Sequence, residues 1–312
     1  MNPLGIEGII TPLLTPFDAE GEIDDEALRE LVRYQIGGGV AALFVNGSSA
    51  EFCLLDDAER DHAVRVVVDE AAGAVPCLAG AIAEGPERVL SLAKDAELVG
   101  ADAAVVTAPY YFSWNAEEVE RFFRQIADRA PLPVVLYDIP WRTHNTITRD
   151  TVLRLSEHPN IVGMKDTTTE GGRFVNLLLE LEGRNDFALY QGSEPLALPS
   201  FLLGADGAVF SLANVAPSTS VQLYDACVRG DLAEAKRLQR IYNHLFRIFS
   251  IVDGGSGSIA GALGGLKVGL ELLGLASSRV RLPGRQASDE EKAQVEELLR
   301  QIPETAPHLQ AR

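Results

Sequence analysis

Short apolar runs alternate with amphipathic segments along the first two thirds of the chain. Each run spans five to seven residues, which suits a strand buried on both faces. The longer segments between them place apolar residues three and four positions apart, as at Leu28, Leu31 and Val32, and this spacing predicts helices. The runs that predict strands are 8–14, 41–45, 77–82, 103–107, 133–137, 160–166, 187–191 and 208–212. The segments that predict helices between them are 24–34, 56–72, 86–99, 116–130, 151–157, 171–181 and 195–203.

The regular order of strand and helix predicts the fold class. Eight strand–helix units without a linker are typical of a (β/α)8 TIM barrel, which needs about 250 residues. The alternative is an open, doubly wound sheet, but the G-x-G-x-x-G turn typical of that fold does not follow residues 8–14. We therefore predict an α/β barrel over residues 1–217. Residues 218–312 predict a C-terminal helical extension packed on the barrel as one structural unit, with helices at 218–229, 232–252, 259–273 and 288–301 and a loose tail at 307–312.

Composition excludes some functions. The 312-residue chain has 45 acidic and 27 basic residues, a net charge of −18, so it lacks the basic surface of a non-specific nucleic-acid binder. The three cysteines show no C-x-x-C spacing, which argues against a disulfide framework or a structural zinc site and fits a reducing cytoplasm. The first residues lack signal-peptide features, and no apolar run reaches membrane-spanning length. We expect a cytoplasmic protein without membrane or nucleic-acid partners.

One lysine stands out among the polar residues. Lys165 lies at the carboxyl end of the sixth apolar run, and active sites of such barrels form where the strands end. Burial disfavours the charged form of an amine, and a desolvated lysine is a nucleophile that forms Schiff bases with carbonyl substrates. The structural alternative is that Lys165 only pairs with Asp166 or with a helix at the strand end. The neighbouring strand ends favour the chemical interpretation.

Further candidate site residues follow successive predicted strands. Taken singly, they could be turn serines, packing tyrosines or a surface arginine. Their occurrence at one strand end after another favours a common site. The candidates are Gly47, Ser48 and Ser49 after the second strand, Tyr111 after the fourth, Tyr137 at the end of the fifth with Arg142 in the loop beyond, Thr167 after the sixth, Gly192 after the seventh and Val209 in the eighth.

The residue types match the needs of a Schiff-base aldolase. The lysine supplies an iminium, hydroxyl groups move protons, and the backbone amides of residues 47–50 can bind the carboxylate of a 2-oxo acid. An arginine can bind a second carboxylate. The five histidines show no metal-ligand cluster, and the ends of strands seven and eight offer little for a phosphate. We expect no metal and no organic cofactor, only a covalent adduct at Lys165.

Four motifs resemble one family. Residues 8–17 (GIITPLLTPF) resemble its opening strand, and residues 47–51 (GSSAE), with Glu59 downstream, resemble its G-[ST]-[ST]-G-E signature. Residues 137–140 (YDIP) are similar to its Y-N-x-P segment, and residues 163–166 (GMKD) to its G-x-K-[DE] lysine motif. The chain thus resembles the dihydrodipicolinate synthase and N-acetylneuraminate lyase family of Schiff-base, pyruvate-dependent class I aldolases.

The resemblance implies roles for individual residues. Lys165 would form the Schiff base with pyruvate, Tyr137 and Ser48 would relay protons, and Ser49 with nearby amides would hold the pyruvate carboxylate. Tyr111 resembles a relay tyrosine that family members lend across a dimer interface. The implied partners are therefore a 2-oxo acid, an aldehyde and further copies of the chain, commonly as a tetramer built from two dimers.

The motifs leave several second substrates open. Arg142 resembles the arginine with which dihydrodipicolinate synthases bind the carboxylate of aspartate semialdehyde, which favours a synthase. Ala50, Trp141 and His144 depart from the pattern, and residues 191–194 (QGSE) are closer to sugar-acid aldolases. The alternatives are an aldolase or dehydratase of 2-keto-3-deoxy sugar acids or 4-hydroxy-2-oxo acids, and a non-catalytic paralogue that binds a 2-oxo acid.

Overall fold

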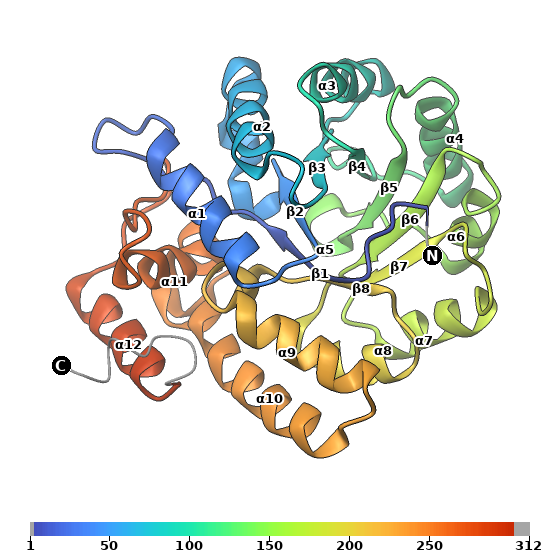
Figure 1. The fold of residues 1–312 in the computed structure, drawn as a ribbon. Coiled ribbons are helices and arrows are strands. Elements are labelled where there is room, and N and C mark those ends of the chain that lie inside the picture. Colours follow the sequence, from blue (N-terminus) through green and yellow to red (C-terminus); the bar gives the residue numbers. More distant parts are fainter. Residues whose placement is uncertain (1–2, 303–312) are drawn as a thin grey trace.

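Eight parallel strands close into a barrel in the computed structural model, which describes residues 3–302 (Figure 1). Each strand pairs with its neighbour in the sequence, and β1 also pairs with β8, so the sheet has no free edge. The predicted α/β barrel is confirmed. The strands are β1 (Gly8–Pro12), β2 (Ala42–Val45), β3 (Cys77–Gly80), β4 (Ala103–Thr107), β5 (Val134–Asp138), β6 (Ile161–Asp166), β7 (Ala188–Gln191) and β8 (Gly207–Val209).

Helices surround the barrel and extend beyond it on one side (Figure 1). Several begin with capping boxes, as at Asp56 with Glu59, which satisfy free backbone amides at the helix start. The helices are α1 (Asp25–Gly37), α2 (Asp57–Ala71), α3 (Pro86–Leu98), α4 (Ala116–Ala127), α5 (Pro140–Thr143), α6 (Arg149–Leu155), α7 (Gly171–Glu180), α8 (Ala197–Leu202), α9 (Pro217–Val228), α10 (Leu232–Leu245), α11 (Ile259–Leu272) and α12 (Asp289–Arg300). Single-turn 3-10 helices are η1 (Ser48–Ala50), η2 (Phe52–Leu54), η3 (Glu194–Leu196), η4 (Ser211–Asn214), η5 (Phe246–Ser250) and η6 (Val252–Gly255).

Several predicted elements end earlier than the apolar pattern suggests, among them the eighth strand and the helix predicted at 232–252. The eighth strand stops at Val209, because Ser211 begins the turn η4. The long helix predicted at 232–252 ends at Leu245, and Asp253 and Gly254 then adopt left-handed backbone angles. The predicted tail at 307–312 lies outside the described residues.

Side chains of the strands alternate between two buried layers. Ala103 and Val105 belong to the cluster inside the barrel, whereas Ala104 and Val106 pack outward against the helices. Tyr137 belongs to the inner cluster as well. This alternation decides which residues at a strand end face the mouth of the barrel and which face the helices.

The C-terminal helices pack on the barrel and on one another. Helix α9 follows β8 and contacts β1. Its Tyr224 hydroxyl donates to the carbonyl oxygen of Asp206, directly before β8, at 3.1 Å. Helices α11 and α12 contact each other and form the red end of the chain in Figure 1. None of the helices within residues 3–302 is long and apolar enough to cross a membrane.

Candidate active site at the strand ends

Lys165 is buried at the carboxyl end of β6, with 6% of its surface exposed. Its Nζ atom lies 4.1 Å from the centroid of the Tyr137 ring and 5.7 Å from that of Phe44. Tyr137 and Lys165 are register partners on β5 and β6, which explains their proximity. Within the described residues the lysine forms no ion pair, and Asp166 pairs with Arg173 instead. The simple pairing of Lys165 with Asp166 is therefore not what the structure shows.

The turn after β2 brings two serines to the same end of the barrel. Only glycine fits at Gly47, because a Cβ atom there would lie 2.7 Å from the Phe44 ring. Ser48 is half-buried, and the buried Ser49 hydroxyl lies 2.9 Å from that of Ser211 after β8. The departure at Ala50 costs little, since its φ is not in the left-handed region that favours glycine.

The ends of β6 and β7 meet closely. A Cβ atom on Gly192 would lie 2.3 Å from the Thr167 hydroxyl oxygen, so glycine is required there too. That hydroxyl oxygen is buried and has no hydrogen-bond partner among residues 3–302, which leaves it available to a ligand. Val209 lies in the cluster inside the barrel. Thr167 and Gly192 thus come together beside the lysine strand, and Val209 lies inside the barrel.

Glu194 is a buried carboxyl group that the sequence analysis did not select. Its Oε1 atom accepts a hydrogen bond from the Ser211 backbone amide at 3.0 Å. Burial raises the pKa of Glu194, and the positive charge of Lys165 opposes this effect. The QGSE segment at 191–194 was the available signal. Together with Ser49 and Ser211, Glu194 forms a polar chain from the serine turn to the end of β7.

The loop after β5 lies at the rim of the site. Trp141 and Arg142 are exposed on α5, and Arg142 Nη1 donates to the Gly257 carbonyl oxygen at 3.1 Å. His144 ends α5 at a φ of 56°, a left-handed conformation that favours glycine. The predicted arginine therefore lies beside a loop of the C-terminal extension and outside the buried cluster around Lys165.

Tyr111 is also peripheral in the single chain. Its side chain is 79% exposed and packs edge-on against Phe112, which in turn contacts Trp114. All three aromatic side chains are exposed. A relay role for Tyr111 would thus require it to act across an interface, as the resemblance implies.

Known proteins match this chain over almost its whole length. Residues 5–302 match the model of the Dihydrodipicolinate synthetase family. The chain belongs to this family. It is 34% identical over 295 residues to a 4-hydroxy-tetrahydrodipicolinate synthase of Methanospirillum hungatei, which covers 94% of this chain and 98% of that protein. The resemblance inferred from the motifs is confirmed, and the chain is a Schiff-base, pyruvate-dependent lyase or synthase.

Solved structures agree. The dihydrodipicolinate synthase of Bacteroides thetaiotaomicron has a TM-score of 0.90 at 32% identity, and the match covers 97% of this chain and 100% of that chain. A prophage protein of E. coli K12 from the dihydrodipicolinic acid synthase family, solved in complex with pyruvate, has a TM-score of 0.88 at 31% identity and covers 95% and 98%.

In this family member, a buried ion pair supports the serine turn. Glu51 follows the turn and pairs with Lys267 of α11, whose Nζ atom also donates to the carbonyl oxygens of Thr15 at 2.9 Å and Arg279 at 2.8 Å. Burial lowers the pKa of Lys267 to about 8, and Glu51 opposes this shift. The Arg281 amide donates to the second oxygen of Glu51 at 2.9 Å. The C-terminal extension therefore helps to hold the turn that carries Ser48 and Ser49.

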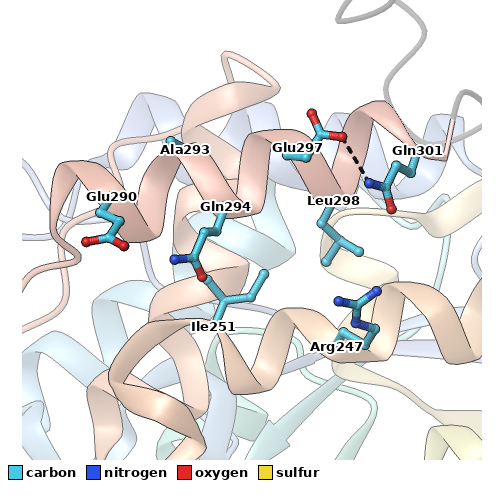
Figure 2. Close-up of a pocket in the computed structure, with 8 residues that line it drawn as sticks. All are labelled: Arg247, Ile251, Glu290, Ala293, Gln294, Glu297, Leu298 and Gln301. Atoms are coloured by element: carbon cyan, nitrogen blue, oxygen red, sulfur yellow. Dashed lines mark hydrogen bonds between the residues drawn. The ribbon is translucent and has the colours of Figure 1, made fainter.

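A separate groove lies on the C-terminal helices, between α12 and the turns after α10 (Figure 2). Its side chains partly satisfy one another, since Gln301 Nε2 donates to Glu297 at 2.9 Å. None of the described residues that line the groove is a lysine. The groove is lined by Arg247, Ile251, Glu290, Ala293, Gln294, Glu297, Leu298 and Gln301.

Proposed function

We propose that the enzyme condenses pyruvate with aspartate semialdehyde at Lys165, as a 4-hydroxy-tetrahydrodipicolinate synthase. The observation that carries the pyruvate half is the buried amine of Lys165 beside the Tyr137 ring, without a carboxylate partner in the described residues. The curated relative with that synthase name and the relative solved with pyruvate support the choice of substrates. The reaction needs no metal or organic cofactor, because the covalent adduct with pyruvate supplies the electron sink.

The proposed reaction begins with attack of the neutral Lys165 amine on the C2 carbonyl of pyruvate. The carbinolamine loses water to give an iminium, and loss of a C3 proton gives an enamine. The enamine carbon then forms the new bond to the aldehyde carbon, whose oxygen takes up a proton. Attack of the aldehyde's own amino group on the iminium carbon finally closes the ring and releases Lys165. Tyr137 and Ser48 are the proposed proton relays.

Pyruvate is oriented by its carboxylate in this proposal. The Ser49 hydroxyl and the backbone amides around η1 form the proposed carboxylate receptor. Gly47 lets the backbone of this turn pack closely against the Phe44 ring, where a Cβ atom would clash. The Thr167 hydroxyl, the bare backbone of Gly192 and the apolar side chain of Val209 complete the proposed pocket.

The acceptor binds on the rim side. Arg142 is the proposed partner of the aldehyde carboxylate, since a guanidinium and a carboxylate form strong paired hydrogen bonds. Its present contact is a single bond to the Gly257 carbonyl oxygen, which leaves other donors of the guanidinium for a ligand. Trp141 beside it would limit the size of the acceptor.

A second candidate reaction has an observation in its favour. The buried Glu194 carboxyl group has a raised pKa and lies within electrostatic reach of Lys165. A carboxyl group that holds its proton can donate to a substrate hydroxyl, as the cleavage or dehydration of a hydroxy-2-oxo acid requires. An aldolase or dehydratase of hydroxy-oxo acids is therefore the alternative that the acceptor screen must include.

We further propose a homo-oligomer, built from dimers, in the cytoplasm. The exposed cluster of Tyr111, Phe112 and Trp114 is the kind of aromatic patch that a second copy would cover. Such an interface would place Tyr111 next to the partner's strand ends. The three free cysteines suit a reducing compartment. Sedimentation of the wild type and of Trp114→Ala tests the assembly, and equal monomeric masses would contradict it.

Borohydride trapping tests the function. Incubation with pyruvate and borohydride should add one reduced pyruvate to the protein, and peptide mapping should place it on Lys165. Aspartate semialdehyde and sugar-derived oxo acids are then compared as second substrates by steady-state rates. The highest kcat/KM with aspartate semialdehyde supports the synthase, and a higher value with a hydroxy-oxo acid supports the alternative. A folded protein that gives no adduct would instead be a non-catalytic binder.

A further inference from the structure

The strands that carry Tyr137 and Lys165 each continue with an aspartate. Asp138 and Asp166 are register partners, one row beyond the pair Tyr137 and Lys165. Because side chains alternate along a strand, the aspartates point toward the helices when Tyr137 and Lys165 point into the barrel. Both aspartates are almost completely buried, with at most 1% of their surface exposed. Two carboxylates in such a place need a common partner.

Arg173 of α7 is that partner. Its Nη2 atom lies 2.8 Å from Asp138 Oδ2, and its Nη1 atom lies 3.1 Å from Asp166 Oδ2. The arginine side chain is only 10% exposed. Nη2 also donates to the Ile147 carbonyl oxygen at 2.5 Å. One guanidinium therefore joins the ends of two adjacent strands to a helix and to the loop before α6, and we call these three charged residues the Arg173 clamp.

Each carboxylate of the clamp also holds backbone. Asp138 Oδ1 accepts from the Ile147 amide at 3.2 Å. Asp166 Oδ1 accepts from the Thr168 amide at 2.8 Å and from the Thr168 hydroxyl at 2.6 Å, which shapes the turn that carries Thr167. The clamp thus determines the direction in which the chain leaves both strands.

We propose that Arg173 is a positioning residue for the Schiff-base chemistry. By joining Asp138 to Asp166, Arg173 holds Tyr137 and Lys165 opposite each other. The 4.1 Å contact between the Lys165 amine and the Tyr137 ring depends on the register of β5 and β6. A shift in the register of β5 and β6, or a separation of their ends, would move the Lys165 amine away from Tyr137. A shift by one residue would even turn one of the two side chains to the other face of the sheet. The inference rests on the proposed roles of Lys165 and Tyr137.

The charges of the clamp are consistent with this role. Two carboxylates share one guanidinium, and burial raises the pKa of Asp138 to about 7, with Arg173 opposing and Asp166 adding to the shift. The Y-N-x-P motif has an uncharged amide where this chain has Asp138. In its ionised form, Asp138 adds a charged contact with Arg173 that an amide at this position would not make.

Three variants of the full-length enzyme test the proposal. Arg173→Met removes both ion pairs, Arg173→Lys keeps one charge but cannot bridge two carboxylates with a planar fork, and Arg184→Met is the control. Arg184 follows the same helix and donates to the Ser156 carbonyl oxygen at 2.7 Å, before β6 begins. The rate of borohydride trapping with pyruvate should fall about 100-fold in Arg173→Met and by less in Arg173→Lys, and should stay within about twofold in Arg184→Met.

Hydrogen exchange supplies a second readout that does not involve pyruvate. Exchange in segments 134–139 and 161–168 should accelerate in Arg173→Met but not in Arg184→Met. If Arg173→Met does not fold, the trapping rate and the hydrogen exchange of Arg173→Lys test the proposal instead. Trapping at the wild-type rate, or unchanged exchange in these segments, would overturn the proposal even if the melting temperature fell. A wild type that traps no pyruvate refutes the proposed function, whereas hydrogen exchange still tests the clamp.

Discussion

The proposed pyruvate side and the proposed acceptor side of the site are built differently. On the pyruvate side, Lys165, Tyr137 and Ser49 are buried and come from strand ends or the turn next to one. On the acceptor side, Trp141 is 47% exposed, and Arg142 is linked to Gly257 of the C-terminal extension by one hydrogen bond. The loop containing Gly257 has several residues with positive φ, among them Asp253.

The difference separates the shared chemistry from the specificity. Strand ends are positioned by the closed barrel, so the groups proposed to form the Schiff base are held by the most constrained part of the fold. Loops can change without disturbing the barrel, so acceptor recognition can differ between family members. Trp141 and His144, which depart from the family motifs, both lie in or next to α5 on the proposed acceptor side.

The strongest way to break the pyruvate side is to remove its nucleophile. Lys165→Ala should lower turnover by about a thousandfold or more, because no other amine can form the adduct in its place. Circular dichroism should show an intact fold. Lys94→Ala is the control, since Lys94 is exposed on α3. Substantial residual activity in Lys165→Ala would refute the assigned nucleophile.

Removal of the cation behind the serine turn should come next. Lys267→Met leaves Glu51 buried without its partner, and we expect a loss of about 3–5 kcal/mol in the free energy of unfolding. Lys292→Met is the matched control, because Lys292 pairs with Glu271 at the surface and should cost at most about 1 kcal/mol. Urea denaturation of both variants measures the difference. Equal losses in the free energy of unfolding would show that the buried ion pair contributes no more to stability than the surface ion pair.

On the acceptor side, the expected effect is confined to one substrate. Arg142→Ala should raise KM for aspartate semialdehyde about 10-fold to 100-fold and leave KM for pyruvate unchanged, because a charge-assisted hydrogen bond contributes about 1.5–3 kcal/mol. Arg88→Ala, which removes an exposed arginine paired with Asp57, is the control. A parallel rise in both KM values would mean that the two sides of the site are not independent.

The last prediction concerns the pH dependence of stability. The pKa of Asp138 is about 7 in the folded protein, above its ordinary value of 3.8, so the native state binds this proton more tightly than the unfolded chain. Stability from this group is present below about pH 4 and is lost as the pH rises to about 7. Asp138→Asn should remove this dependence, and the rise of the pKa from 3.8 to about 7 corresponds to at most about 4 kcal/mol between the ends of the window. Urea denaturation across that range measures it, and parallel curves would contradict the shift.

The sequence was sufficient for the fold and for most of the buried site. Every predicted strand is present, and Lys165, Tyr137, Ser49 and Gly192 lie where their strand ends predict. Patterns of this kind are local, since burial on both faces and the order of strand and helix are written in consecutive residues. The motifs also carried the family, which the matches over residues 5–302 confirm.

Contacts between distant segments could not be predicted in this way. The pairing of Glu51 with Lys267, the bridge from Arg173 to two strand ends and the bond from Arg142 to Gly257 join residues that no local pattern connects. Glu194 also became a candidate only when Ser211 and Lys165 were seen beside it. The sequence alone determined which residues stand at the strand ends. The tertiary structure decided which charges are buried together, because the partner of a buried charge is set by packing across the barrel and not by its neighbours in the chain.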